Sequence, residues 1–239
     1  MTTIDIRPAD SRFHTDAGWL DSRHSFSFGP FHDPTNTGHG LLIVSNDDRV
    51  TAGGGFGTHG HRDMEIITWV LEGQLEHRDS AGNHGVLYPG LAQRMSAGTG
   101  IMHSEMNHSA DHPVHFIQMW VLPDTAGVEP GYEQLDVNDA LAHGGLVTVA
   151  SGNGVEGAIH IHQKGAEMFV GRLRSGESVD IPDAPFVHVF VARGTVTFDG
   201  QTLAAGDAVR LTDAGAPTVL AEEDAEVIVW AMEADAPQQ

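Results

Sequence analysis

Apolar residues occur along this chain in short runs, and Gly, Pro, Asn or Asp interrupts them about every 8–12 residues. Short runs of apolar or alternating residues are typical of strands. The clearest ones cover residues 66–71, 74–77, 114–122, 187–192, 195–198 and 225–230. Only residues 136–142 mix apolar and small polar positions in a way that favours a turn of helix. The pattern therefore predicts an all-β protein built as a sandwich or barrel.

One order of strand and turn occurs twice. An apolar strand ends at Gly73 and an alternating strand follows it, and the same order surrounds Gly194. A repeat of this size predicts two similar β-barrels in tandem. Pro, Gly and Asp collect over residues 123–145, where we expect the link between them. We therefore assign residues 1–135 to an N-terminal barrel and residues 136–239 to a C-terminal barrel.

Composition limits the classes of function. The 239 residues include 12 Lys and Arg against 33 Asp and Glu, a formal net charge of −21. Such a surface repels phosphate backbones and anionic lipids, so we expect no direct nucleic-acid partner and no membrane partner. The absence of cysteine excludes disulfides, iron–sulfur clusters and thiol catalysis. With no signal-peptide pattern and no apolar run of about 18 residues, we expect a cytoplasmic protein.

The 16 histidines include pairs whose spacing carries chemical meaning. In a strand, side chains at positions i and i+2 point to one face, so His59 and His61 share a face. Glu65 continues the same parity, and His103 and Glu105 have this spacing in a second glycine-rich segment. If the two strands oppose each other in one barrel, three imidazoles and a carboxylate converge. Such a set binds divalent transition metals.

A His-x-His pair also occurs by chance in a histidine-rich chain, where each histidine can be an ordinary polar residue. The inference of a metal site therefore depends on two clusters with matching parity. The C-terminal half has the pair His160 and His162, which lies well before the strand ending at Gly194. No histidine follows His188, so a second cluster is missing there. We expect a C-terminal barrel without a metal site.

Longer motifs resemble those of a known family. Gly53, His59, His61 and Glu65 fit the first cupin motif, and a second cupin motif follows over residues 98–107. Further matching segments cover residues 19–28, 72–73, 77–83 and 95–105. On these residues the chain resembles the pirin family of the cupin superfamily, and within it the bacterial quercetinase-like bicupins. The resemblance extends more loosely to the end of the chain.

The resemblance implies two tandem cupin barrels of the double-stranded β-helix, or jelly-roll, type. It also implies one divalent transition metal in the N-terminal barrel. Carried over residue by residue, the ligands are His59, His61, His103 and Glu105. An ordinary cupin takes its carboxylate ligand from the first motif, so Glu65 is the rival for the fourth position.

The resemblance further implies an activity. It points to Fe(II) as the natural metal and to a flavonol such as quercetin as a model substrate, whereas the ligand types alone also suit Mn, Co, Ni, Cu and Zn. We expect ring-opening dioxygenation of a flavonol or another enol or phenolic small molecule. In this reaction Glu105 is both a ligand and the general base that takes the proton of the substrate hydroxyl.

Two other functions stay open. Some pirin-like proteins bind transcription factors according to the redox state of their metal, so the chain can instead be a metal or redox sensor with a protein partner. A zinc-bound isomerase or hydrolase of the broader cupin group is the third reading. A substrate-wide opening to the metal favours the enzyme, and a closed site favours the sensor. Because two barrels in one chain can complete their own cores, we expect a monomer.

Overall fold

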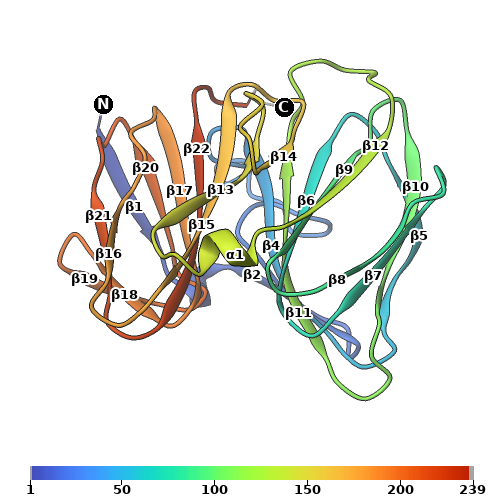
Figure 1. Cartoon of the computed structure of the whole chain (residues 1–239), viewed down its shortest axis with the longest axis horizontal. Helices are drawn as coiled ribbons and strands as arrows, with labels where there is room; N and C mark the ends of the chain where they lie inside the picture. Colours follow the sequence, from blue (N-terminus) through green and yellow to red (C-terminus); the bar gives the residue numbers. More distant parts are fainter. Residues whose placement is uncertain (1, 237–239) are drawn as a thin grey trace.

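Nearly all the regular structure of the protein is β, as the hydrophobic pattern predicted. The structure is a computed structural model and describes residues 2–236. The exceptions to the β structure are a 3₁₀ turn, η1 (Ala9–Ser11), and a single turn of helix, α1 (Asn138–Leu141). The helix lies within the segment 136–142, where the sequence predicted one. Figure 1 shows the strands arranged as two barrels side by side, one running from green to blue and the other from orange to red.

The N-terminal barrel consists of a seven-stranded and a four-stranded sheet whose neighbours pair antiparallel. In spatial order the larger sheet contains β12 (Gly131–Asp136), β9 (Leu91–Ser96), β6 (Glu65–Glu72), β11 (Val114–Val121), β4 (Leu42–Val50), β3 (Leu20–His24) and β2 (Phe13–Asp16). The smaller sheet contains β5 (Gly55–His61), β10 (Ile101–Asn107), β7 (Leu75–Asp79) and β8 (His84–Leu87).

The C-terminal barrel repeats this arrangement of seven and four strands. Its larger sheet contains β1 (Thr3–Arg7), β20 (Ala208–Thr212), β17 (Phe186–Arg193), β22 (Ala225–Met232), β15 (Ala166–Leu173), β13 (Leu146–Ser151) and β14 (Ile159–His160). Its smaller sheet contains β16 (Ser178–Asp180), β21 (Thr218–Ala221), β18 (Thr195–Phe198) and β19 (Gln201–Ala204). The sequence repeat around Gly73 and Gly194 therefore corresponds to two barrels of the same design.

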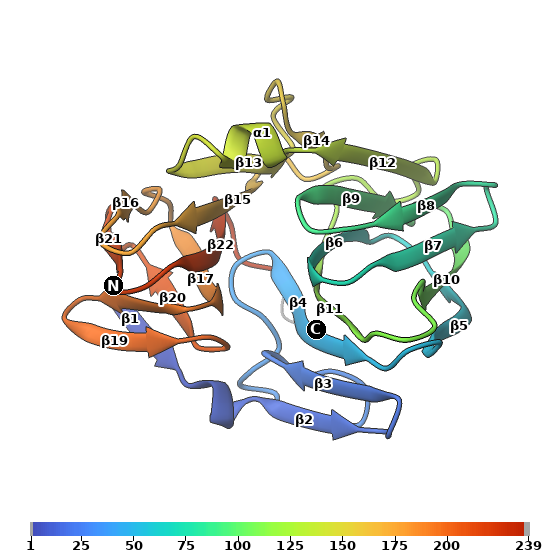
Figure 2. The ribbon, with the colours of Figure 1, turned by 60° about the horizontal axis from the view of Figure 1, so that its bottom comes forward.

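The first strand of the chain pairs within the C-terminal barrel. β1 lies antiparallel to β20, with Ile4 opposite Leu211, and Figure 2 shows it in blue beside the orange β20. The chain then crosses to β2 and β3 of the other barrel. The sequence pattern did not predict this exchange, because residues 1–135 were assigned together. The division at residues 135 and 136 stays a prediction, and β12 extends to Asp136 while pairing with β9.

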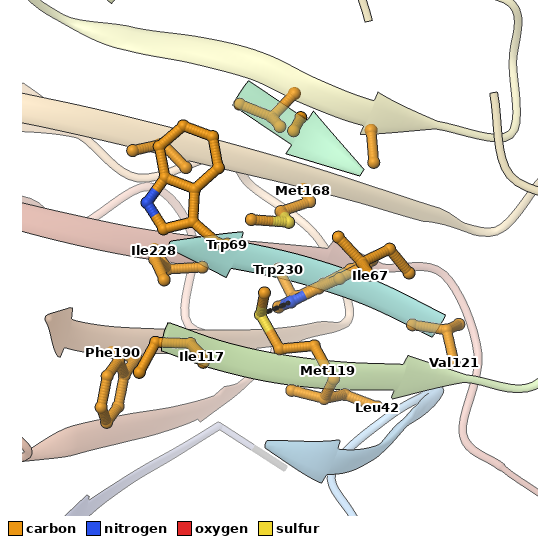
Figure 3. Close-up of a cluster of buried hydrophobic side chains, with 14 of the residues drawn as sticks. Leu42, Ile67, Trp69, Ile117, Met119, Val121, Met168, Phe190, Ile228 and Trp230 are labelled. Atoms are coloured by element: carbon orange, nitrogen blue, oxygen red, sulfur yellow. Dashed lines mark hydrogen bonds between the residues drawn. The ribbon is translucent and has the colours of Figure 1, made fainter. Parts of the chain in front are cut away.

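The largest cluster of buried apolar side chains lies between the barrels. Ile67 and Trp69 of β6 and Met119 of β11 pack against Met168 of β15 and Trp230 of β22 (Figure 3). The indole Nε1 of Trp230 donates a hydrogen bond to the Met119 sulfur over 3.2 Å. Because the two larger sheets share this core, each barrel covers an apolar face of the other.

The interiors of the two barrels differ in chemistry. The interior cluster of the C-terminal barrel is apolar and includes Val189, Phe198, Val209 and Val229. The N-terminal barrel has smaller apolar clusters, and buried polar residues that include His103 lie beside them. Buried polar groups must be hydrogen-bonded or bound to a ligand, so the N-terminal barrel is where a functional site is expected.

Candidate metal centre

Three histidines predicted from the sequence come together in the smaller sheet of the N-terminal barrel. β10 pairs antiparallel with β5, and His103 lies directly opposite His59. The ring centroids are 4.4 Å apart for His59 and His103, 4.9 Å for His59 and His61, and 5.0 Å for His61 and His103. One ring nitrogen of each lies within 4.8 Å of the others, so the three can share one ion. The two-residue spacing of His59 and His61 on β5, together with the position of His103 opposite His59, produces this convergence.

The hydrogen bonds of these rings leave nitrogen lone pairs free for a metal. The Nδ1 of His59 donates to the Gly57 carbonyl over 2.8 Å, so its Nε2 is the ring nitrogen available to a metal. His103 Nε2 is buried and has no hydrogen-bond partner within residues 2–236. A metal-ligating histidine commonly donates its other ring N–H to a carbonyl or carboxylate, as His59 does here. The residues present therefore fit a divalent transition metal.

Burial and neighbouring groups keep the imidazoles of His61 and His103 neutral. Burial, together with the neighbouring His59, lowers the pKa of His61 to about 4. Burial and the adjacent His59 and His61 lower the pKa of His103 to about 3. At neutral pH both side chains are thus uncharged, which is the state that coordinates a metal.

Glu105 lies next to these histidines but belongs to a second group. The register of β10 against β5 shifts between His103 and Glu105, with the extra residue on β5, and the Glu105 carboxylate lies within 4.8 Å of ring nitrogens of His77 and His103. The Glu105 Oε2 accepts a 2.7 Å hydrogen bond from Gln118 Nε2, and burial raises the pKa of this carboxyl. The fully buried Thr68 hydroxyl lies 3.4 Å from Oε1. That Glu105 is the fourth ligand stays a prediction.

Glu65 begins β6 of the larger sheet, whereas the three histidines lie on β5 and β10 of the smaller sheet. The Glu65 Oε2 accepts hydrogen bonds from Ser96 Oγ at 2.9 Å and from the backbone N–H of His162 at 3.1 Å. The His162 ring is 3.4 Å from Oε1. Glu65 is in neither group that could hold a metal. It contacts instead His162, one of the C-terminal histidine pair, across the seam between the barrels.

His77 is a site residue that the sequence reasoning missed. It lies on β7 opposite Glu105, is fully buried, and stacks on the Tyr132 ring with centroids 4.8 Å apart. Its Nε2 donates to Asp79 over 3.2 Å, so its Nδ1 accepts from His103 Nδ1 over 3.5 Å. This chain of hydrogen bonds holds the His103 ring through Nδ1 and leaves its Nε2 without a hydrogen-bond partner within residues 2–236. The spacing of His77 and Asp79, two residues apart, was the available signal.

A cavity of about 400 Å³ opens beside the histidines. Polar side chains on its wall include His59, His61 and Glu105, and the half-buried His59 and His61 are accessible from it. Four aromatic side chains also line it: Trp19, Phe28, Phe56 and Trp120. Cavities of 300–1,000 Å³ with an apolar lining and a few polar groups are typical of small-molecule sites.

Comparisons with known proteins agree with this geometry. The pirin family model matches residues 6–121, and the quercetinase C-terminal cupin domain matches residues 148–232. A Mycobacterium tuberculosis protein whose name carries a provisional quercetin 2,3-dioxygenase assignment is 56% identical over 234 residues, or 97% of this chain and 96% of its own. The chain belongs to the pirin family.

Other pirin relatives share both sequence and fold. The quercetin 2,3-dioxygenase of Escherichia coli K12 is 41% identical over 228 residues, 95% of this chain and 97% of that protein. The bacterial pirin YhhW of E. coli, solved in complex with nickel(II), superposes with a TM-score of 0.90 at 38% identity, covering 98% of this chain and all of that one. The fold of tandem cupin barrels is thus confirmed. Within residues 2–236, no helix has the length and apolar character needed to cross a membrane.

Proposed function

We propose that this pirin is a metal-dependent dioxygenase that opens a ring of a flavonol or of another planar enol or phenolic small molecule. The observation that carries the proposal is a cluster of three histidines, two of which, His59 and His61, lie on the wall of an aromatic cavity of about 400 Å³. The quercetin 2,3-dioxygenase name of the E. coli relative supports the same substrate class.

The proposed metal ligands are His59, His61, His103 and Glu105, and the proposed metal is Fe(II). The same donors also suit Mn, Co, Ni, Cu or Zn. When bound, a redox-active divalent metal polarises an enol or phenol oxygen and promotes reaction of the electron-rich ring with dioxygen. For a flavonol, both atoms of dioxygen would enter the ester product while the two ring carbon–carbon bonds at the enol-bearing carbon break, that carbon leaves as carbon monoxide, and the substrate supplies the electrons.

The aromatic walls of the cavity bind and orient a planar substrate. Trp120 packs edge-on against His61, with centroids 4.9 Å apart, and Phe28 packs edge-on against Trp120 at 5.6 Å. Trp19 and Phe56 form a second edge-to-face pair at 5.2 Å on the same cavity. These apolar surfaces exclude water from the substrate and place its hydroxyl next to the histidines.

Glu105 is the proposed general base. Its carboxylate lies on the cavity wall, and the hydrogen bond from Gln118 fixes Oε2. The weakly held Oε1 is then the atom that accepts the proton of the substrate hydroxyl. The cavity favours the enzyme over the alternative of a metal or redox sensor with a protein partner, because a sensor needs no opening of substrate size.

We further propose that the protein is a cytoplasmic monomer.

The test is elemental analysis of anaerobically purified protein, with dioxygen uptake on quercetin recorded on the same sample. We expect about one redox-active metal per chain and uptake that depends on quercetin. Glu105→Gln is expected to abolish uptake, whereas Glu65→Gln, a matched change at a buried carboxylate outside the cavity, keeps both the metal and the activity.

Other outcomes contradict parts of the proposal. Redox metal without uptake on quercetin or other enols and phenols supports the sensor. Zinc alone, with no uptake after reconstitution with iron, overturns the dioxygenase. Loss of metal in Glu65→Gln but not in Glu105→Gln assigns the fourth position to Glu65.

A further inference from the structure

A small polar cavity lies at the seam between the barrels, away from the candidate metal centre. It has a volume of about 20 Å³. Its lining includes Arg7 of β1, Arg12 after η1, Ser25 after β3, Asn36 in the loop before β4, His188 of β17 and Arg210 of β20. Figure 2 shows the blue N-terminal segment passing between the barrels in this part of the molecule.

Buried polar atoms without partners gather around this cavity. Within residues 2–236, six of the nine buried side-chain nitrogen and oxygen atoms that lack a hydrogen-bond partner belong to its lining. They are Arg12 Nε, Arg12 Nη1, Ser25 Oγ, Asn36 Oδ1, His188 Nε2 and Arg210 Nε. Their side chains are deeply buried: Arg12 is 4% exposed and His188 1%. An unpaired buried polar atom costs about 1–3 kcal/mol, so a cluster of six requires a ligand.

The lining is also positively charged. Arg12 pairs with Asp47 at 3.1 Å, but Asp47 additionally accepts a hydrogen bond from His115 over 2.6 Å. Arg210 donates to the Ser25 carbonyl over 2.9 Å and lies 4.5 Å from the centre of the Phe26 ring. Asp5 lies opposite Arg210 in the pairing of β1 with β20 and interacts with it electrostatically, but the ion pairs within 4.0 Å among residues 2–236 do not include Arg210. Burial lowers the pKa of Arg210 to about 10, which still leaves it charged at neutral pH.

The kinds of unpaired atom decide between water and an anion. Arg12 Nε, Arg12 Nη1, Arg210 Nε and Ser25 Oγ are all donors, whereas Asn36 Oδ1 is the one certain acceptor. A water molecule accepts only two hydrogen bonds and must place its own two protons. An anion accepts from all four donors and also compensates the buried charge of Arg210.

We propose that this cavity is a binding site for one monatomic anion of the size of chloride. The volume of about 20 Å³ is enough for a single water-sized body and too small for phosphate or a carboxylate ligand. The anion joins the N-terminal segment and the loop before β4 to strands of the C-terminal barrel. Because this loop also carries Phe28 of the metal-side cavity, anion binding holds the barrels together and orders part of that cavity wall.

The test uses the whole protein and bromide as the probe. Thermal melts at constant ionic strength compare bromide with gluconate, which is too bulky for the cavity. We expect the Tm to rise by about 3 °C or more as bromide replaces gluconate up to about 200 mM. A crystal grown in bromide is expected to show an anomalous peak within about 3.5 Å of Arg12 Nη1 and Arg210 Nε.

Variants separate this site from general salt effects. Arg210→Met keeps the packing against Phe26 but removes the charge, so its Tm is expected not to respond to bromide. Ser25→Ala keeps both arginines and is expected to weaken the bromide dependence by about fivefold to tenfold, which covers the case in which Arg210→Met fails to fold. Arg49→Gln, at an exposed arginine that lies near Asp47, is the matched control and keeps the wild-type response. An equal Tm in bromide and gluconate, or water instead of bromide in the cavity, overturns the proposal.

Discussion

The indole Nε1 of Trp69 on β6 donates a 2.6 Å hydrogen bond to Glu226 on β22, across the seam between the two barrels. The other carboxylate oxygen of Glu226 accepts from Arg172 over 2.9 Å. Both tryptophans of the seam, Trp69 and Trp230, are fully buried. The seam thus combines an apolar core with a satisfied ionic group, and the stability of each barrel depends on the other.

This contact predicts unequal costs for two similar changes. Trp69→Phe leaves Oε1 of Glu226 without its donor, so we expect it to lower the free energy of unfolding by about 3 kcal/mol beyond the packing loss. Trp230→Phe loses a weaker hydrogen bond to the Met119 sulfur and is the control. Urea unfolding at neutral pH measures both. Equal losses would show that the Glu226 contact adds nothing.

The chain of hydrogen bonds from Asp79 through His77 to His103 predicts a graded effect on metal binding. His103→Gln removes a ligand, and we expect loss of nearly all bound metal. His77→Phe keeps the ring stacked on Tyr132 but removes the hydrogen bond that orients His103, so metal affinity is expected to fall about 10–100-fold. Titration of the apoprotein with Ni²⁺, followed by calorimetry, measures both variants. Unchanged affinity in His77→Phe contradicts the positioning role.

The raised pKa of the buried Asp48 carboxyl predicts that the free energy of unfolding depends on pH. Asp48 is fully buried on β4, and burial, opposed by a hydrogen bond from Ser22, raises its pKa to about 7. Between the unfolded pKa near 3.8 and about 7, the folded protein holds a proton that the unfolded chain has lost, so this group's contribution falls as the pH rises.

Asp48→Asn does not lose this proton. We therefore expect the variant to gain stability relative to the wild type between pH 5 and pH 8, by about 1–3 kcal/mol at the upper end. Taking the difference between the two proteins cancels the titration of all other groups. Urea unfolding across this pH range is the measurement, and a difference that is constant with pH contradicts the raised pKa.

The position of Phe28 on the cavity wall predicts that its ring contributes to substrate binding. Its ring lines the cavity and packs on His24, with centroids 5.0 Å apart, and on Trp120, but it does not touch the three histidines. Phe28→Leu is expected to raise the KM for quercetin about 3–10-fold, because aromatic contacts contribute about 0.5–1.5 kcal/mol. We expect kcat and metal content within about twofold of the wild type. Steady-state dioxygen uptake checks this, and an unchanged KM excludes Phe28 from the substrate site.

The sequence was sufficient for the parts of the site that depend on strand periodicity. His59 and His61 lie together because residues two apart on a strand share a face. His103 joins them because β10 pairs with β5, and the sequence predicted this only on the condition that the two strands oppose each other. The rule fails for Glu65. β5 ends at His61 and Asp63 adopts a positive φ of 48°, so the chain turns into a different sheet and the parity does not continue.

Other features depend on the register between strands, which the local sequence does not encode. The role of His77 depends on the register of β7 against β10, which no short motif encodes. The pairing of β1 with β20 joins residues about 200 positions apart, and a five-residue strand such as Thr3–Arg7 has no pattern that names its distant partner. Register between distant strands is set by the packing of the whole barrel.

That pairing affects how the protein is made. β1 is synthesised about 200 residues before its partner β20. At about 5–20 residues per second, the strand waits on the order of 10–40 s before the C-terminal barrel can close. During this time its backbone donors and acceptors are unpaired, and an exposed strand edge invites pairing with other chains. A circular permutation that moves residues 2–12 to the C-terminal end would place β1 soon after β20 in the order of synthesis. The yield of folded protein during translation should then rise.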